Sequence, residues 1–108
     1  MIVQLKRRNS RYPDLTPKQH YVVIGIEADD FRILSDRGQP YLYPHRLFEV
    51  VDASEPADWV QDTGGDGERY AYPPALAAVG FFEDYFDGKK SEVSTFWRVV
   101  NQHLAAVS

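Results

Sequence analysis

Residues 20–51 limit the possible fold more than any other part of this sequence, because short strand patterns and turns alternate along them. Three runs rich in β-branched and aromatic residues stand here: Tyr21–Ile26, Phe31–Leu34 and Tyr41–Tyr43. Polar turns at 27–30 and 35–38 separate the runs, and Gly38 in the second turn suits a positive φ. This spacing predicts an antiparallel sheet with short connections.

The third run ends at Pro44 and leads into a different pattern. Pro44–Leu47 predicts a single 3₁₀ turn, since proline is tolerated at the first helical position, and Phe48–Val51 predicts the next strand. Residues 41–51 resemble the end of an SH3-like barrel, where a Tyr-Pro pair enters a 3₁₀ turn before the last strand. Such barrels serve many unrelated tasks, so the resemblance concerns the fold and not the function.

The clearest helix is predicted over residues 91–106, and Ser91 suits its N-cap. Apolar side chains recur along it at helical spacing and form one stripe: Val93, Phe96, Trp97, Val100, Leu104 and Val107. We expect this stripe to bury Phe96, Trp97 and Val100 against the open side of the barrel. Before this helix, Pro73-Pro74 can open another one, Gly80 is expected to break it, and Gly88 is expected to end its continuation as a C-cap.

These elements predict an α+β fold in a single domain, residues 1–108. A small SH3-like antiparallel β-barrel is expected at about 15–60, followed by C-terminal helices packed on it at 73–107. Further short strands are predicted at Met1–Leu5 and Trp59-Val60. The chain has no cysteine, which excludes disulfides, thiolate nucleophiles and metal sites built on cysteine. A chain of this length can bury enough surface to fold without them.

Charge is distributed unevenly along the chain. The formal net charge is −4, but between residues 55 and 87 a single basic residue, Arg69, stands among eight acids. The acids are Glu55, Asp58, Asp62, Asp66, Glu68, Glu83, Asp84 and Asp87. One positive and eight negative charges leave −7 for this segment. A field of this sign repels phosphate and attracts basic surfaces.

Patterns for catalysis and metal binding are weak. The loop Asp62–Gly67 begins like an EF-hand loop, but Gly64 and Pro73 occupy two ligand positions, including that of the bidentate glutamate. The histidines stand far apart and lack metal-binding spacing: His20, His45 and His103. There is no G-x-S-x-G nucleophile motif. We therefore predict no catalytic residue, no metal site, no cofactor and no enzyme activity.

The N-terminal residues do not have the order of a secretory signal, in which basic residues precede an apolar run of at least about 7 residues. No stretch approaches the roughly 18 apolar residues of a membrane span. We therefore expect a cytoplasmic location and no membrane partner.

Nucleic-acid binding is an alternative function, because an N-terminal basic arm stands beside an aromatic residue. The arm comprises Lys6, Arg7, Arg8 and Arg11, next to Tyr12. Basic residues interleaved with aromatics are typical of proteins that bind single strands. Residues 20–51, in contrast, carry three arginines against five acids, which gives no net attraction for phosphate. A nucleic-acid-associated barrel that uses this arm therefore stays open.

Protein binding is the function that the acidic segment favours, because acids flanked by tyrosine and tryptophan suit a basic protein partner. We predict a non-catalytic protein-binding module. Its predicted protein-binding residues are Asp58, Trp59, Asp62, Asp66, Glu68, Tyr70, Glu83, Asp84 and Asp87. On a helix, Phe82, Tyr85 and Phe86 share one face, which can be core or interface.

As a whole, the chain resembles the small acidic immunity proteins that bacteria encode beside polymorphic toxins. The resemblance rests on the SH3-like portion, the proline-rich entry to Phe82–Gly88, the size and the acidic second half. It implies that an acidic surface covers the basic cleft of a cognate toxin, such as a nuclease, and so blocks it. A structural adaptor and a small hydrolase are further alternatives.

Overall fold

The longest strand, β2 (His20–Glu27), organises the sheet, because every other strand of the described chain pairs with β2 directly or through one neighbour. The structure is a computed structural model that describes residues 1–107. The other strands are β1 (Ile2–Leu5), β3 (Asp30–Leu34), β4 (Pro40–Pro44), β5 (Phe48–Asp52), β6 (Val60–Thr63) and β7 (Arg69–Tyr72). Two 3₁₀ turns and two helices complete the chain: η1 (His45–Leu47), η2 (Pro74–Leu76), α1 (Phe81–Phe86) and α2 (Lys90–Val107).

All paired strands are antiparallel, and the path β4-β3-β2-β1-β5 runs without a break. The turn η1 connects β4 to β5, as the pattern at Pro44–Leu47 predicts. Among the described residues β4 and β5 do not pair with each other, so the sheet is open along this path. The predicted α+β class and the antiparallel strands over residues 20–51 are confirmed.

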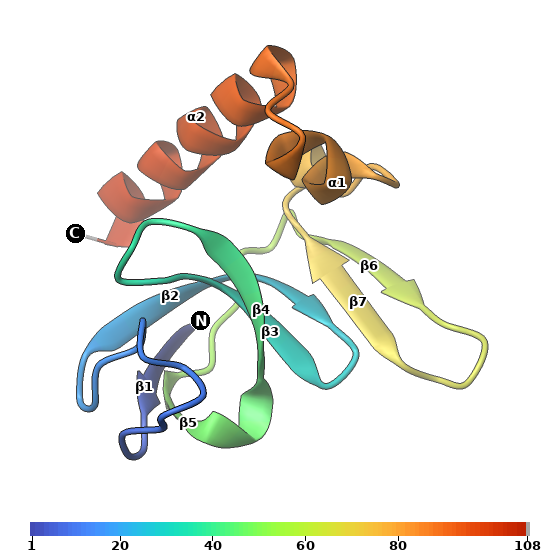
Figure 1. Ribbon diagram of the computed structural model, residues 1–108. Helices are drawn as coiled ribbons and strands as arrows, with labels where there is room; N and C mark the ends of the chain where they lie inside the picture. Colours follow the sequence, from blue (N-terminus) through green and yellow to red (C-terminus); the bar gives the residue numbers. More distant parts are fainter. Residues whose placement is uncertain (108) are drawn as a thin grey trace.

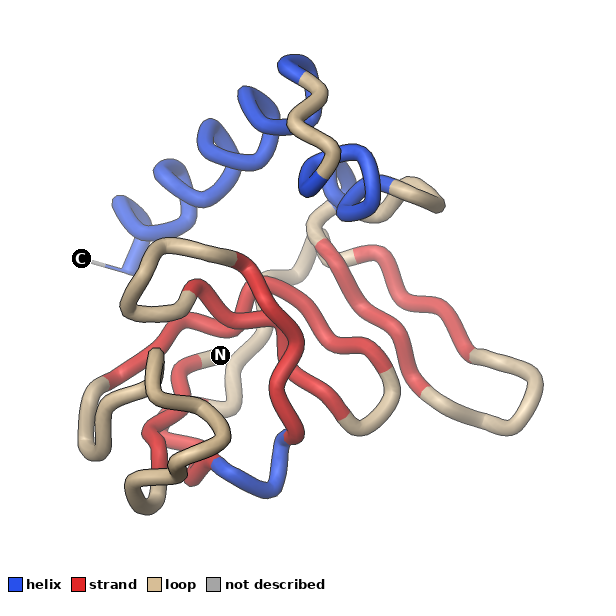
Figure 2. The backbone as a smooth tube through the Cα atoms, viewed as in Figure 1, coloured by secondary structure: helices blue, strands red, loops and turns tan. Residues whose placement is uncertain are grey.

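A hairpin of β6 and β7 extends the sheet beyond this path. It is joined through the pairing of Ile26 with Ala71, and Figure 1 shows it projecting from one side of the molecule. Figure 2 shows the helices as a separate layer over one side of the strands. The strand β7 is not predicted from the sequence, because the acids and aromatic residues in the segment before Pro73 suggest a surface.

Gly25 permits the close approach of this hairpin to β2. The pairing register of β2 with β3 shifts between Val23 and Gly25, which marks a β-bulge. A Cβ atom added to Gly25 would lie 2.1 Å from the Tyr72 ring. The ring therefore lies directly on the backbone of β2, in space that any side chain would fill.

Two hydrophobic clusters hold the fold together. The first, which we call the sheet core, is mainly aliphatic and includes the fully buried residues Val3, Leu5, Leu15, Val23 and Ile33. In β1, the inward side chains alternate with more exposed ones, as expected of a strand with one face on the core. The second, the helix core, comprises Ile24, Tyr72, Leu76, Phe81, Phe82, Tyr85, Phe96 and Val100. It fixes both helices to β2.

The stripe of α2 is confirmed in its centre, where Phe96 and Val100 are buried. One detail of the prediction is wrong. Trp97 is only half-buried and packs at the margin of the helix core, because it lies one position round the helix from Phe96. Leu104 is 41% exposed, because α2 extends past the edge of the cluster. The side chain of Val107 lies outside the described residues.

The ends of the helices differ from the prediction as well. The helix α2 begins at Lys90, and the Ser91 hydroxyl donates to the Glu92 carboxylate, so Ser91 is not an N-cap. Pro73-Pro74 opens only the one-turn η2, because α1 begins afresh after Gly80. Gly80 and Gly88 both have positive φ, and the predicted break and stop at these two glycines are confirmed.

Candidate functional site

Residues 64–68 connect the two strands of the β6–β7 hairpin, so Asp62 and Thr63, which the sequence suggested as part of a loop, lie within β6. The Gly64 N–H donates to the Glu68 carbonyl at 2.7 Å, and the Gly67 N–H donates to the Gly64 carbonyl at 3.0 Å. The Asp66 carboxylate accepts from the Glu68 N–H, and this bond lowers the pKa of Asp66. Three of the predicted protein-binding acids, Asp62, Asp66 and Glu68, are therefore exposed along an ordered hairpin.

The one cation of the acidic segment is tied to an acid. The Arg69 guanidinium donates through two nitrogens to the two carboxylate oxygens of Glu55, and also to Gln61. The arginine holds the pKa of Glu55 below its usual value. A second pair joins Lys89 to Asp84 at 2.9 Å. The remaining acids of the hairpin, Asp62, Asp66 and Glu68, are therefore not neutralised by these ion pairs.

A groove with a volume of about 540 Å³ lies between the hairpin and the segment 77–83. Three predicted residues line it: Asp62 and Tyr70 from the hairpin, and Glu83 from α1. Two exposed valines stand beside these acids, Val60 at 47% and Val79 at 105% relative exposure. The groove therefore combines carboxylates with exposed apolar surface.

Arg32 lines the inner part of the groove and is fully engaged within the protein. It donates to the Tyr72 hydroxyl at 2.7 Å, to the Pro40 carbonyl at 2.6 Å and to the Glu27 carboxylate at 2.8 Å. Its guanidinium also lies 3.8 Å from the centroid of the Phe82 ring. The only cationic side chain in the groove is thus buried and paired, and it does not offset the acids at the rim.

The structure does not place the other predicted residues in this groove. Trp59 is only 5% exposed and packs in the sheet core, so its assignment to a protein-binding surface is wrong. The residue directly precedes β6. Asp58 and Asp87 are exposed, and Asp84 is half-buried in its pair with Lys89, but none of the three lines the groove.

The aromatic face of α1 belongs partly to the core and partly to the surface. Phe82 and Tyr85 are buried in the helix core. Phe86 is 45% exposed, and its ring stacks on that of Tyr41 with centroids 5.5 Å apart. Val60, Val79 and Arg32 could not be recognised from the sequence as parts of the groove, because nothing in their local pattern shows that the hairpin and the segment 77–83 meet.

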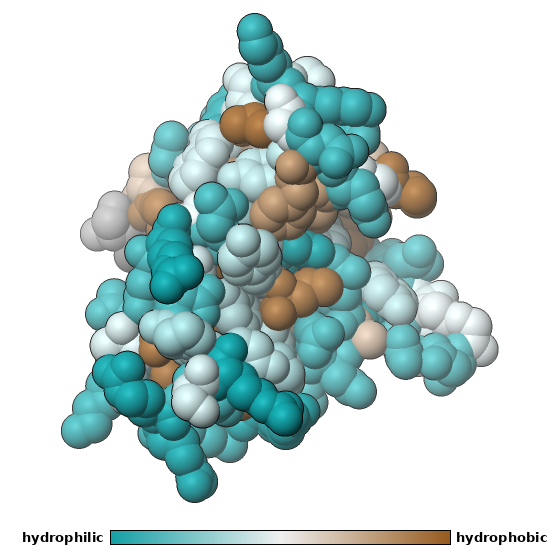
Figure 3. All heavy atoms as spheres, in the orientation of Figure 1, coloured by the Kyte–Doolittle hydropathy of each residue, from teal (hydrophilic) through white to brown (hydrophobic). Residues whose placement is uncertain are grey.

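The basic arm lies at a different place on the molecule. Lys6, Arg7, Arg8 and Arg11 are exposed in the connection from β1 to β2, and none of them belongs to the ion pairs formed within residues 1–107. Figure 1 shows this connection on the opposite side from the hairpin, and Figure 3 shows strongly hydrophilic atoms over the same region. The exposed cations of the basic arm therefore lie away from the exposed acids of the hairpin.

Comparisons of the chain with protein-family models, with curated proteins and with solved structures give no match. Within residues 1–107, no helix has the length and apolar character needed to cross a membrane. In the same part of the chain, no three His, Asp or Glu side chains gather where they could hold a metal ion. The arrangement of the residues themselves is the basis for any functional inference.

Proposed function

We propose that this chain is a non-catalytic protein-binding module that holds a basic segment of a partner protein in the groove between the β6–β7 hairpin and residues 77–83. One observation carries the proposal: exposed valines and carboxylates share this groove, while its only cation is buried and paired. A lysine or arginine side chain offers both an apolar stem and a charged head, so it suits such a surface.

The size of the groove supports a peptide-like segment as the occupant. A volume of about 540 Å³ is within the range of ligand pockets, about 300–1,000 Å³. The acids at its rim would speed the encounter with a basic partner, since long-range attraction acts mainly on the association rate. The hydrogen-bonded hairpin would present them with little loss of conformational freedom on binding.

We further propose that the N-terminal strands form an SH3-like barrel. The strand order β4-β3-β2-β1-β5 and the 3₁₀ turn between β4 and β5 support this assignment. An immunity-type role is the form of the function that the sequence resemblance favours. In that role the acidic face would occlude the basic cleft of a cognate bacterial toxin.

The test uses a peptide of alternating arginine and leucine as the basic probe, and a peptide of alternating glutamate and leucine as its matched opposite. We expect NMR shifts of groove residues such as Tyr70 and Ala71 with the basic peptide alone. The double variant Asp62→Asn/Glu83→Gln should weaken this binding several-fold and flatten its salt dependence. The control Asp66→Asn/Asp87→Asn removes the same charge outside the groove. Equal weakening by both variants would show general attraction instead of a site.

A second candidate function rests on the four exposed, unpaired cations of the basic arm. In this alternative, the connection between β1 and β2 contacts the phosphates of a nucleic acid. Binding of a short single-stranded RNA should then weaken steeply with added salt. The variant Arg7→Ala/Arg8→Ala should make the slope of log K against log salt concentration shallower, by the equivalent of about two phosphate contacts. Absence of RNA binding at micromolar protein and low salt would dismiss this function.

A further inference from the structure

The basic arm is an ordered loop, although its four cationic side chains are exposed. The Lys6 N–H donates to the Leu47 carbonyl at 3.0 Å, and the Tyr12 N–H donates to the Asn9 carbonyl at 3.0 Å. The Tyr12 ring packs edge-on against the buried ring of Tyr43, with centroids 5.5 Å apart. The backbone of the arm therefore loses little conformational freedom when the arm binds a partner.

Within the described residues, the arm pairs with no acid of its own molecule. The ion pairs of this part of the chain involve Arg32, Arg69 and Lys89. Asp14, the acid that follows the arm, is half-buried and accepts from the Tyr43 hydroxyl at 2.5 Å. Figure 1 shows the arm and the β6–β7 hairpin on opposite sides of the molecule. A contact between the arm and the groove beside the hairpin, which we call the acidic groove, must therefore join two molecules.

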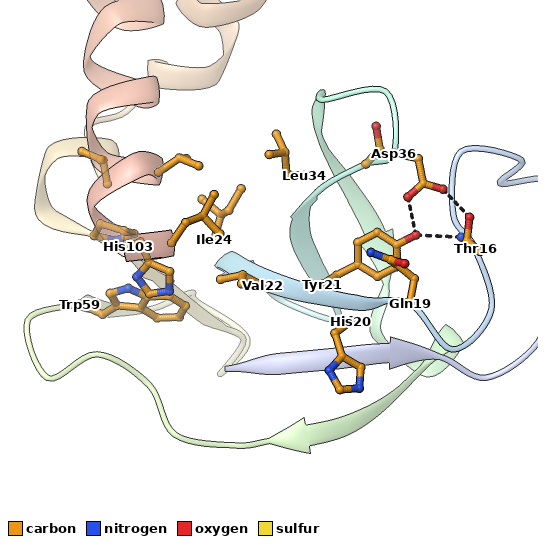
Figure 4. Close-up of a pocket in the computed structure, with 15 residues that line it drawn as sticks. Thr16, Gln19, His20, Tyr21, Val22, Ile24, Leu34, Asp36, Trp59 and His103 are labelled. Atoms are coloured by element: carbon orange, nitrogen blue, oxygen red, sulfur yellow. Dashed lines mark hydrogen bonds between the residues drawn. The ribbon is translucent and has the colours of Figure 1, made fainter. Parts of the chain in front are cut away.

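A second concave site suits the arm less well. It is a cavity of about 550 Å³ between α2 and the first half of β2, and its middle is apolar, with Ile24 and Leu34. Among the described residues, Asp36 supplies the one carboxylate of its lining. Figure 4 shows that this carboxylate accepts hydrogen bonds from the Tyr21 hydroxyl at 2.7 Å and from the Thr16 hydroxyl at 2.6 Å. Several cations together therefore find more opposite charge at the acidic groove.

We propose that the partner held in the acidic groove is a second copy of this chain, whose basic arm enters the groove. This inference rests on the proposed function and names its partner. The charges are complementary, because Asp62 and Glu83 are exposed at the groove and the arm carries four exposed cations. The apolar stems of the arginines would cover Val60 and Val79, since long basic side chains pack their stems on apolar surface.

The contact is head-to-tail, because it joins two different surfaces. Each pair of molecules leaves one arm and one groove without a partner, so further copies can add at both ends. One loop in one groove is a small interface, and the net charge of −4 opposes the approach of two copies. We therefore expect weak assemblies that grow with protein concentration and dissociate as salt screens the paired charges.

Sedimentation velocity measures this assembly directly. At low salt, the average sedimentation coefficient of the unaltered chain should rise between micromolar and millimolar protein. It should return to the value of the monomer at about 0.5 M salt. The charge reversal Asp62→Lys/Glu83→Lys in the groove should give monomers at low salt. The matched control Asp66→Lys/Asp87→Lys makes the same change of charge at exposed acids outside the groove, and it should still assemble.

The arm is tested in the same way. Arg7→Glu/Arg8→Glu should give monomers, while Lys90→Glu/Arg98→Glu, at exposed cations of α2, should assemble like the unaltered chain. A mixture of the groove-reversed and arm-reversed proteins should assemble again, because each reversed surface then meets the opposite charge on the other protein. A loss of assembly through altered folding would not be restored by mixing.

Three results would overturn the proposal: monomers of the unaltered chain at low salt, equal losses in the variants and their controls, or a mixture that stays monomeric. Assembly that increases with salt would also overturn it, since charge pairing weakens with salt. The arginine–leucine peptide separates this inference from the proposed function. If the peptide binds the groove while the chain stays monomeric, the second copy is not the partner and the proposed function stands. If the peptide fails to bind as well, both are wrong.

Discussion

The sheet core and the helix core differ in the kind of side chain that fills them. The sheet core relies on fully buried aliphatic residues such as Leu15 and Ile33, which interdigitate closely. The helix core relies on rings: the Phe96 centroid lies 4.8 Å from that of Tyr85 and 6.0 Å from that of Phe82. Both cavities border the helix core. Large rigid rings between helices and a sheet leave open space at the margin of the helix core.

The largest effect should come from the centre of the helix core. Phe96 is completely buried, so Phe96→Ala should reduce the free energy of unfolding by about 3–5 kcal/mol in a denaturant titration. Leu104→Ala on the same helix is the control, and because Leu104 is exposed it should cost well under 1 kcal/mol. A Phe96→Ala loss below about 1 kcal/mol would show that the helix core adds little to stability.

The contact of Gly25 with Tyr72 should have the next largest effect. Gly25→Ala places a methyl group 2.1 Å from the Tyr72 ring, and such overpacking typically costs about 1–3 kcal/mol. In the Tyr72→Ala background the ring is gone, so the added methyl should cost almost nothing. A double-mutant cycle measures this coupling. Additive losses would mean that the ring moves away without cost.

A buried tyrosine in each core donates to a carboxylate, which allows a matched comparison. The Tyr43 hydroxyl donates to Asp14 in the sheet core, and the Tyr72 hydroxyl donates to Glu27 and accepts from Arg32 in the helix core. Burial raises the pKa of both tyrosines. Thermal unfolding should show a loss of about 2 kcal/mol for Tyr72→Phe and about 1 kcal/mol for Tyr43→Phe, since the former removes two bonds to charged groups. Equal losses would show that Arg32 finds another partner.

The smallest effect concerns pH. Because burial lowers the pKa of His103 in the folded chain, the unfolded chain binds the proton more readily. The stability from neutral His103 is therefore present above the unfolded pKa of about 6.5 and is lost as the pH falls below it. Melting temperatures from pH 8 to 5.5 should fall less in His103→Gln than in the unaltered protein. The same slope in both proteins would show that the burial of His103 does not affect stability.

The strands of the first half could be predicted from sequence because their signals are local. Alternation, the turn at Gly38 and the stop at Pro44 fix β2 to β4 without knowledge of distant residues. The stripe of α2 was equally clear. The hairpin strand β7 was missed because its strand character depends on pairing with β2, far away in the sequence. Trp59 was misplaced for the same reason, since burial at a strand entrance is decided by the packing of the whole sheet.

The acids of the site could be identified from sequence, but their grouping could not. Asp62 and Glu83 are far apart along the chain, and they line one groove only in the folded chain, where β7 pairs with β2. The cavity under α2 left no trace in the sequence at all. The two unpartnered nitrogens of the described chain, on Trp59 and His103, likewise become visible only when the packing around them is known.

The contact of Tyr72 with Gly25 also has a consequence for folding during synthesis, because the two residues leave the ribosome at different times. Synthesis runs from the N-terminus, so β1 to β5 leave the ribosome before Tyr72 and long before Phe96. Their pairings are mostly between neighbours in sequence and can form early, since short loops close at little entropic cost. During that interval the backbone at Gly25 and the side chain of Ile24 lack their cover from the helix core. The nascent sheet thus carries one bare apolar strip, which makes it prone to association until the last helix arrives.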